Sequence, residues 1–166
     1  MKNFLIVGGS KGLGLSISKQ LSYEGHNIVI ISRDKNIKVE KFPNIKIIKF
    51  DLLNTEKNKI DEIFKNHPKF DGICFAQRYR DGKGEKYNKS IEEYKVMVDS
   101  VAKFIIQFTN YLNKSKKINK EKISRLIIIG STYATRIGRD QDWSYHSIKS
   151  AQLSLVKYFS LNSGGC

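Results

Sequence analysis

Long apolar runs and cysteines are scarce in this sequence, and each scarcity excludes a class of protein. No apolar run approaches the roughly 18 residues that indicate a membrane-spanning helix, and the N-terminus shows no signal-peptide pattern. Two cysteines, Cys74 and Cys166, make no disulfide framework, and Cys74 lies in an apolar run that predicts a buried, unreactive thiol. We therefore expect a cytoplasmic protein without a membrane partner, and we predict no metal site.

Acidic residues are also few, at 16 against 30 lysines and arginines, so the formal net charge is +14. A basic chain can bind nucleic acid. Here the basic residues are dispersed except between Lys114 and Lys122, and lysine, isoleucine and asparagine are abundant while alanine is scarce. This composition indicates a bias spread over solvated faces, so we expect no nucleic-acid partner. A steep salt dependence of binding would reveal the alternative.

The length and the order of the apolar runs predict an α/β fold. The 166 residues, 40% of them apolar, suffice for one domain with a core, and we find no internal repeat or domain boundary. Strands are predicted at 4–7, 27–31, 45–50, 72–76 and 125–129, and helical spacing recurs at 15–23, 60–64, 90–112 and 145–161. Strands that alternate with helices through the whole chain predict a doubly wound parallel sheet, Rossmann-like, over residues 1–166.

Finer patterns refine three of these segments. Ser90 followed by Glu93 is a capping-box pattern, which predicts the start of the long helix. The polar stretch 77–88 before it is predicted as a loop. The strand at 125–129 is nearly all branched aliphatic, which is typical of a strand covered on both faces.

Three glycines, Gly8, Gly12 and Gly14, separate the first strand from the first helix. Such a turn brings backbone N–H groups together with the positive end of a helix, which suits a phosphate. Glycine is needed because a Cβ would block close approach and a positive φ. The spacing G-x-x-x-G-x-G is weak evidence alone, since a tight strand–helix connection needs glycines too.

Tyr145 and Lys149 are four residues apart on the last predicted helix, which places them one turn apart on one face. A nearby ammonium favours the phenolate and makes the tyrosine a better acid and base near neutral pH. Ser131 follows the fifth strand, where ligands bind in open α/β sheets. Alone, Tyr-x-x-x-Lys is more often a solvated helix face, but the glycine turn and Ser131 in the right order make a coincidence improbable.

Together these features resemble the N-terminal two-thirds of the short-chain dehydrogenase/reductase family. The family's first motif, T-G-x-x-x-G-x-G, matches the stretch that starts at Val7, which replaces the threonine. Its acidic residue after the third strand matches Asp51, followed by Leu52. Its Asn-Asn-Ala-Gly motif appears as Cys-Phe-Ala-Gln, in which Ala76 alone is retained.

The catalytic residues of the family match in the same order. Its serine matches Ser131, with Thr132 as the alternative by spacing, and its Tyr-x-x-x-Lys matches Tyr145 and Lys149. The asparagine of its proton relay aligns with Ser100, a substitution that puts the relay in question.

The resemblance implies hydride transfer between a nicotinamide and a carbonyl or alcohol substrate. Tyr145 would be the general acid and base, Lys149 would hold the nicotinamide ribose, and Ser131 would polarise the substrate oxygen. The cofactor-binding residues it implies are Gly8, Ser10, Lys11, Gly12, Leu13, Gly14, Arg33, Asp51, Leu52, Ala76, Tyr145 and Lys149.

The end of the second strand favours NADP(H) over NAD(H). An NAD-selective site usually offers a carboxylate to the ribose 2′-OH there, whereas this sequence has Ser32 and then Arg33. Lys11, in the glycine turn, adds a second cation for a 2′-phosphate, although Asp34 would partly neutralise Arg33.

The resemblance also implies a homodimer or homotetramer, paired through the helices predicted at 90–112 and 145–161. The family's sheet has two more strands, so we expect the chain to be C-terminally incomplete, or a degraded member that lacks useful turnover. A non-catalytic dinucleotide-binding protein is the alternative function, favoured by the altered fourth-strand motif and Ser100.

Overall fold

The computed structural model describes residues 1–34, 37–39, 41–67, 69–79, 86–116, 124–139 and 141–162. Its strands form one five-stranded sheet in the order β3-β2-β1-β4-β5, and every neighbouring pair is parallel. The strands are β1 (Asn3–Val7), β2 (Asn27–Ser32), β3 (Ile45–Lys49), β4 (Gly72–Phe75) and β5 (Arg125–Ile128). The predicted α/β class and the five predicted strands are confirmed.

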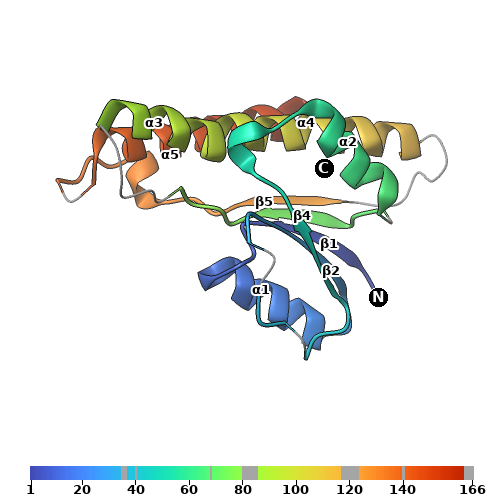
Figure 1. Ribbon diagram of the computed structural model, residues 1–166. Coiled ribbons are helices and arrows are strands. Elements are labelled where there is room, and N and C mark those ends of the chain that lie inside the picture. Colours follow the sequence, from blue (N-terminus) through green and yellow to red (C-terminus); the bar gives the residue numbers. More distant parts are fainter. Residues whose placement is uncertain are drawn as a thin grey trace.

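The helices lie unequally on the two faces of this sheet. They are α1 (Gly12–Tyr23), α2 (Lys57–Asn66), α3 (Lys86–Tyr94), α4 (Ser100–Lys116) and α5 (Trp143–Asn162). Figure 1 shows α1 on one face and the other four on the opposite face. The described residues between β2 and β3 contain no helix, so the expected alternation through the whole chain is wrong there. Instead Ile37, Val39 and Phe42 of that connection pack against the α1 face.

Each face buries its own apolar cluster because successive strand residues point to opposite sides. In β1, Leu5 and Val7 belong to the cluster under α2 and α4, whereas Ile6 belongs to the cluster under α1. Ile60 of α2 and Phe104 of α4 are fully buried in the first cluster. The two clusters therefore hold the strands, and the segments that follow them, in fixed positions.

The long helix predicted at 90–112 is longer and interrupted. It consists of α3, a π-helical turn at Lys95–Asp99, and α4. Because α3 already begins at Lys86, the predicted capping box is wrong and the predicted loop ends earlier; residues 80–85 of that loop lie outside the described residues. The Glu93 carboxylate instead accepts a hydrogen bond of 3.1 Å from Ser144 Oγ at the start of α5.

The fifth strand differs from its prediction as well. Its residues alternate between exposed and half-buried, and Ile127 is 51% exposed. Leu126 and Ile128 pack against the α4 side, but no described helix covers β5 on the α1 side. The prediction of a strand covered on both faces is therefore wrong for the described structure, in which β5 is an edge strand with a described helix on one face only.

Two simpler predictions can be compared with the structure. Cys74 is buried, and burial raises the pKa of its thiol, which keeps it unreactive. The lysine-rich stretch enters α4 as far as Lys116, and residues 117–123 lie outside the described residues. No helix in the described ranges is long and apolar enough to cross a membrane.

Candidate functional site

A cavity of about 600 Å³ opens at the carboxyl ends of the parallel strands. The turn after β1, the segments after β2, β3, β4 and β5, and helix α5 all contribute to its wall. Ligands of open α/β sheets bind at this edge, where the strand order changes direction beside β1. Of the predicted site residues, those that line the cavity are Gly8, Ser10, Lys11, Gly12, Leu13, Arg33, Asp51, Leu52, Ala76, Tyr145 and Lys149.

The glycine turn forms part of the wall of the cavity. Gly8 and Gly12 have φ angles of 84° and 56°, in the left-handed region that favours glycine. A Cβ on Gly14 would lie 2.4 Å from the carbonyl oxygen of Gly8, so the first turn of α1 packs directly on the end of β1. Gly14 is therefore needed for this packing although it does not line the cavity.

The N-terminus of α1 faces this cavity without a side-chain cap. Lys11 occupies the N-cap position and makes no capping hydrogen bond with its side chain. The first N–H groups of an α-helix have no partner within the helix, and around Gly12 a Cβ would meet no atom within 4 Å. Open space beside free N–H groups fits a phosphate group.

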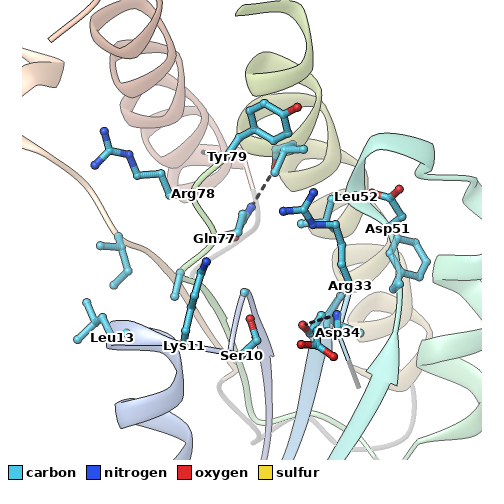
Figure 2. Close-up of a pocket in the computed structure, with 18 of the residues that line it drawn as sticks. Ser10, Lys11, Leu13, Arg33, Asp34, Asp51, Leu52, Gln77, Arg78 and Tyr79 are labelled. Carbon is cyan, nitrogen blue, oxygen red and sulfur yellow. Dashed lines mark hydrogen bonds between the residues drawn. The ribbon is translucent and has the colours of Figure 1, made fainter. Parts of the chain in front are cut away.

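Polar side chains after β2 and β3 surround the far end of the cavity. Figure 2 shows Lys11 and Arg33 extending in the same direction, with Asp51 beyond Arg33. The Asp51 carboxylate accepts a hydrogen bond of 3.0 Å from the Leu53 backbone and so caps a short 3-10 turn. The Ser32 hydroxyl accepts a hydrogen bond of 3.1 Å from the Asp34 backbone N–H, which fixes the backbone bend at Arg33.

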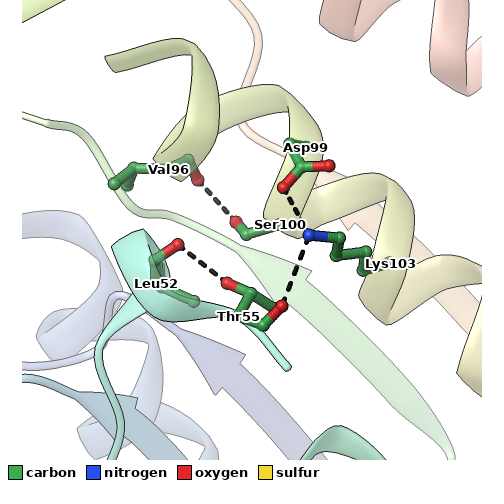
Figure 3. A network of polar contacts seen from close by, with 6 residues as sticks. All are labelled: Leu52, Thr55, Val96, Asp99, Ser100 and Lys103. Carbon is green, nitrogen blue, oxygen red and sulfur yellow. Dashed lines mark hydrogen bonds and ion pairs between the residues drawn. The ribbon is translucent and has the colours of Figure 1, made fainter. Parts of the chain in front are cut away.

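A network on α4 holds the segment after β3 in place. Lys103 Nζ donates to Asp99 at 2.7 Å and to the Thr55 carbonyl oxygen at 3.3 Å, while the Thr55 hydroxyl donates to the Leu52 carbonyl oxygen at 2.7 Å (Figure 3). Lys103 of α4 therefore helps to position Leu52 in the cavity wall by way of Thr55.

The two residues of the Tyr-x-x-x-Lys motif lie together on α5. Lys149 Nζ is 5.8 Å from the centre of the Tyr145 ring and donates to the Ile129 carbonyl oxygen at 2.8 Å and to Gln152 Oε1 at 2.9 Å. Burial, followed by the Arg78 charge and partly opposed by Glu93, lowers the pKa of Lys149 to about 8.

The other two predicted catalytic residues do not line this cavity. Ser131 Oγ accepts a hydrogen bond of 3.3 Å from the Tyr133 backbone, and Ser131 caps the 3-10 turn Thr132–Ala134 beyond Gly130, which does line the cavity. Ser100 is fully buried, and its hydroxyl donates to the Val96 carbonyl oxygen at 2.7 Å (Figure 3). Their catalytic roles stay predictions.

Among the residues that sequence reasoning missed are two that line the cavity and one that supports Lys149. Gln77 and Arg78 follow β4 and line the cavity, while the buried Gln152 joins Lys149 to the Met97 carbonyl oxygen with a bond of 2.7 Å. The position of Gln77 and Arg78, directly after a strand, was the available signal, as it was for Asp51. No local sequence signal pointed to Gln152, because its role depends on its contact with Met97 in another helical segment.

Comparisons with solved structures agree with the fold. No protein-family model matches the chain, and no curated protein does. Among solved structures, a short chain dehydrogenase family protein from Francisella tularensis subsp. tularensis aligns with a TM-score of 0.74 and 23% identity, covering 98% of this chain and 64% of that one.

Two further solved structures carry nucleotides. A short chain dehydrogenase from Leptospira borgpetersenii with bound NAD⁺ has a TM-score of 0.81 and 16% identity, covering 98% of this chain and 67% of that one. A variant of ElxO with NADPH bound has a TM-score of 0.78 and 18% identity, covering 98% and 68%. The chain thus has the fold of the short-chain dehydrogenases and spans about two thirds of the length of these structures.

Proposed function

We propose that this protein is an NADP(H)-dependent oxidoreductase of short-chain dehydrogenase type, acting on a carbonyl or alcohol substrate. The observation that carries the proposal is the single cavity that the glycine turn and the pair Tyr145 and Lys149 line together. The nucleotides bound in similar solved structures, NAD⁺ and NADPH, support a nicotinamide cofactor.

The residues present fit such a cofactor. The uncapped N-terminus of α1 and the open space beside Gly12 suit a pyrophosphate. Gln77 Oε1 is a buried acceptor without a hydrogen-bond partner in the described structure, so a donor from a ligand would satisfy it. Asp51, Leu52 and Ala76 would hold the adenine and the neighbouring parts of the nucleotide. When bound, the nicotinamide would supply or accept the hydride.

The protein's own groups would handle the proton. Tyr145 would give a proton from its hydroxyl to the substrate oxygen during reduction and take it back during oxidation. Ser131 would donate a hydrogen bond to the same oxygen, since its own hydroxyl oxygen accepts from Tyr133 and leaves its proton available. Lys149 has three donors and uses two on Ile129 and Gln152, which leaves one for a ribose hydroxyl.

The preference for NADP(H) rests on Lys11 and Arg33. Both line the cavity, and each charge-assisted contact with a 2′-phosphate contributes about 1.5–3 kcal/mol. Asp34 also lines this end, so the preference reflects the balance of two cations against one carboxylate.

We further propose a homodimer or homotetramer in the cytoplasm. Exposed apolar side chains on α4 and α5, namely Ile106, Val156, Tyr158 and Leu161, support pairing through these helices. A monomer by light scattering at tens of micromolar would contradict this assembly.

A non-catalytic dinucleotide-binding protein is the second candidate. The engaged hydroxyl of Ser100, which replaces the relay asparagine, favours it. NADPH oxidation with a panel of aldehydes and ketones separates the two functions. We expect turnover with some members of the panel, and saturable NADPH binding without any turnover would support the second candidate.

A further inference from the structure

A guanidinium group lies over the ring of the proposed acid/base residue. The central carbon of Arg78 is 4.5 Å from the centre of the Tyr145 ring, and Arg78 Nη2 donates to Gln141 Oε1 at 3.2 Å. Arg78 follows β4 and Gln141 precedes α5, so two segments far apart in the sequence fix the group there. Figure 2 shows the Arg78 side chain extending away from Arg33 and Asp51. Arg78 thus belongs to the tyrosine side of the cavity.

Within the described residues, the Arg78 guanidinium makes no direct ion pair. Glu93 acts on the same region: Arg78 opposes the rise that burial causes in the pKa of Glu93. However, that carboxylate is buried and accepts from Ser144. The exposed guanidinium therefore retains N–H donors for a ligand.

We infer that Arg78 binds a carboxylate of the substrate, so that this site acts on oxo acids or hydroxy acids rather than on neutral carbonyl compounds. This inference rests on the proposed function and names its substrate class. A guanidinium offers parallel N–H donors that match a carboxylate. Because the guanidinium carbon is 4.5 Å from the centre of the ring that ends in the Tyr145 hydroxyl, one small molecule can place its carboxylate at Arg78 and its reacting oxygen at that hydroxyl.

Matched pairs of ligands test the inference. In the first arm, NADPH oxidation is followed with pyruvate and methyl pyruvate, and with acetoacetate and methyl acetoacetate. We expect kcat/KM to be about tenfold to a hundredfold higher for each acid than for its ester, from one charge-assisted contact. Arg78→Leu should remove this preference by lowering the value for the acid alone. Arg78→Lys, which keeps the charge but loses the fork, should retain part of it.

A second arm uses binding and needs no turnover. Oxamate and its neutral counterpart oxamide are titrated by calorimetry into the NADPH-loaded protein, and oxamate should bind at least tenfold more tightly. Arg78→Leu should abolish this difference. Arg125→Leu is the matched control, because Arg125 is an exposed arginine at the start of β5, away from the cavity at the carboxyl ends of the strands. This variant should leave the affinities for oxamate and oxamide unchanged.

The outcomes separate the inference from the function beneath it. Esters reduced as well as acids, with Arg78→Leu affecting both equally, would overturn the inference and leave the oxidoreductase intact. Oxamate binding that depends on Arg78, without reduction of any carbonyl compound, would support the inference and overturn the proposed function. Arg78→Leu that weakens NADPH binding without changing the preference for oxamate would make Arg78 a cofactor ligand and overturn the inference.

Discussion

The two ends of the cavity are built from different materials. At the glycine end, which comprises Gly8 and residues 10–13, the wall is a turn that leads into the uncapped N-terminus of α1 and follows a strand packed on both faces. At the tyrosine end, which comprises Gln77, Arg78, Tyr145 and Lys149, the wall consists of side chains held by hydrogen bonds from other elements.

This difference indicates a division of labour. A backbone cradle recognises phosphate groups that all dinucleotides share. A wall of side chains can change with the substrate without disturbing the cradle. Variants at the two ends should therefore have separable effects, and the predictions below test that separation in order of decreasing size.

The largest effect is expected from Tyr145→Phe. This change removes the transferable proton while it keeps the ring that contacts Arg78. Turnover should fall by about 10²–10⁴-fold, while the dissociation constant of NADPH stays unchanged. Tyr23→Phe, an exposed position on α1 outside the proposed interface, serves as the control. Activity within a few-fold of wild type would remove Tyr145 from the mechanism.

Because of Lys149, the free energy of unfolding should change with pH in the alkaline range. Its pKa is lowered from 10.5 to about 8, so between these values the unfolded chain binds a proton that the folded protein has released. Stability therefore rises with pH across this window as the cost of burying the charge disappears. Urea unfolding at pH 7.5 and pH 10.5 should show wild type gaining up to about 3 kcal/mol relative to Lys149→Met. If the difference in the free energy of unfolding between wild type and Lys149→Met did not change with pH, the lowered pKa of Lys149 would be contradicted.

At the glycine end, Gly14→Ala should destabilise the protein without touching the tyrosine end. The added Cβ would lie 2.4 Å from a backbone oxygen that cannot move freely, and overpacking of this kind costs about 1–3 kcal/mol. The control is Gly130→Ala, where a Cβ meets nothing within 4 Å; thermal unfolding should change little. Equal effects of the two substitutions would show that the turn is not tightly packed.

Sequence reasoning succeeded where the signal is local. The strands, the glycine turn and the Tyr145–Lys149 spacing follow from periodicity and from short motifs, and the structure brings both motifs to one cavity. It failed at the π-helical turn before Ser100 and at Arg78 and Gln152, because these depend on contacts between separate elements. The glycine end was therefore predictable, and much of the tyrosine end was not.

The smallest effect is expected from Ile127→Ala, with Ile6→Ala as its buried counterpart. Ile6 in β1 is buried on the α1 side of the sheet, whereas Ile127 in β5 is half exposed. Ile6→Ala should cost about 2–5 kcal/mol, and Ile127→Ala less than about 1 kcal/mol. Chemical unfolding measures both. Equal costs would indicate that the exposed face of β5 is covered in solution.

The central claim is that the cavity binds a nicotinamide dinucleotide and prefers the one that carries a 2′-phosphate. A titration with NADPH and NADH tests this claim most directly. We predict saturable binding of both, with NADPH about tenfold or more tighter, as one charge-assisted contact would give. The double variant Lys11→Ala and Arg33→Ala should bring the two dissociation constants together by weakening NADPH alone. Absence of saturable NADPH binding, or equal dissociation constants for NADPH and NADH, would contradict the account.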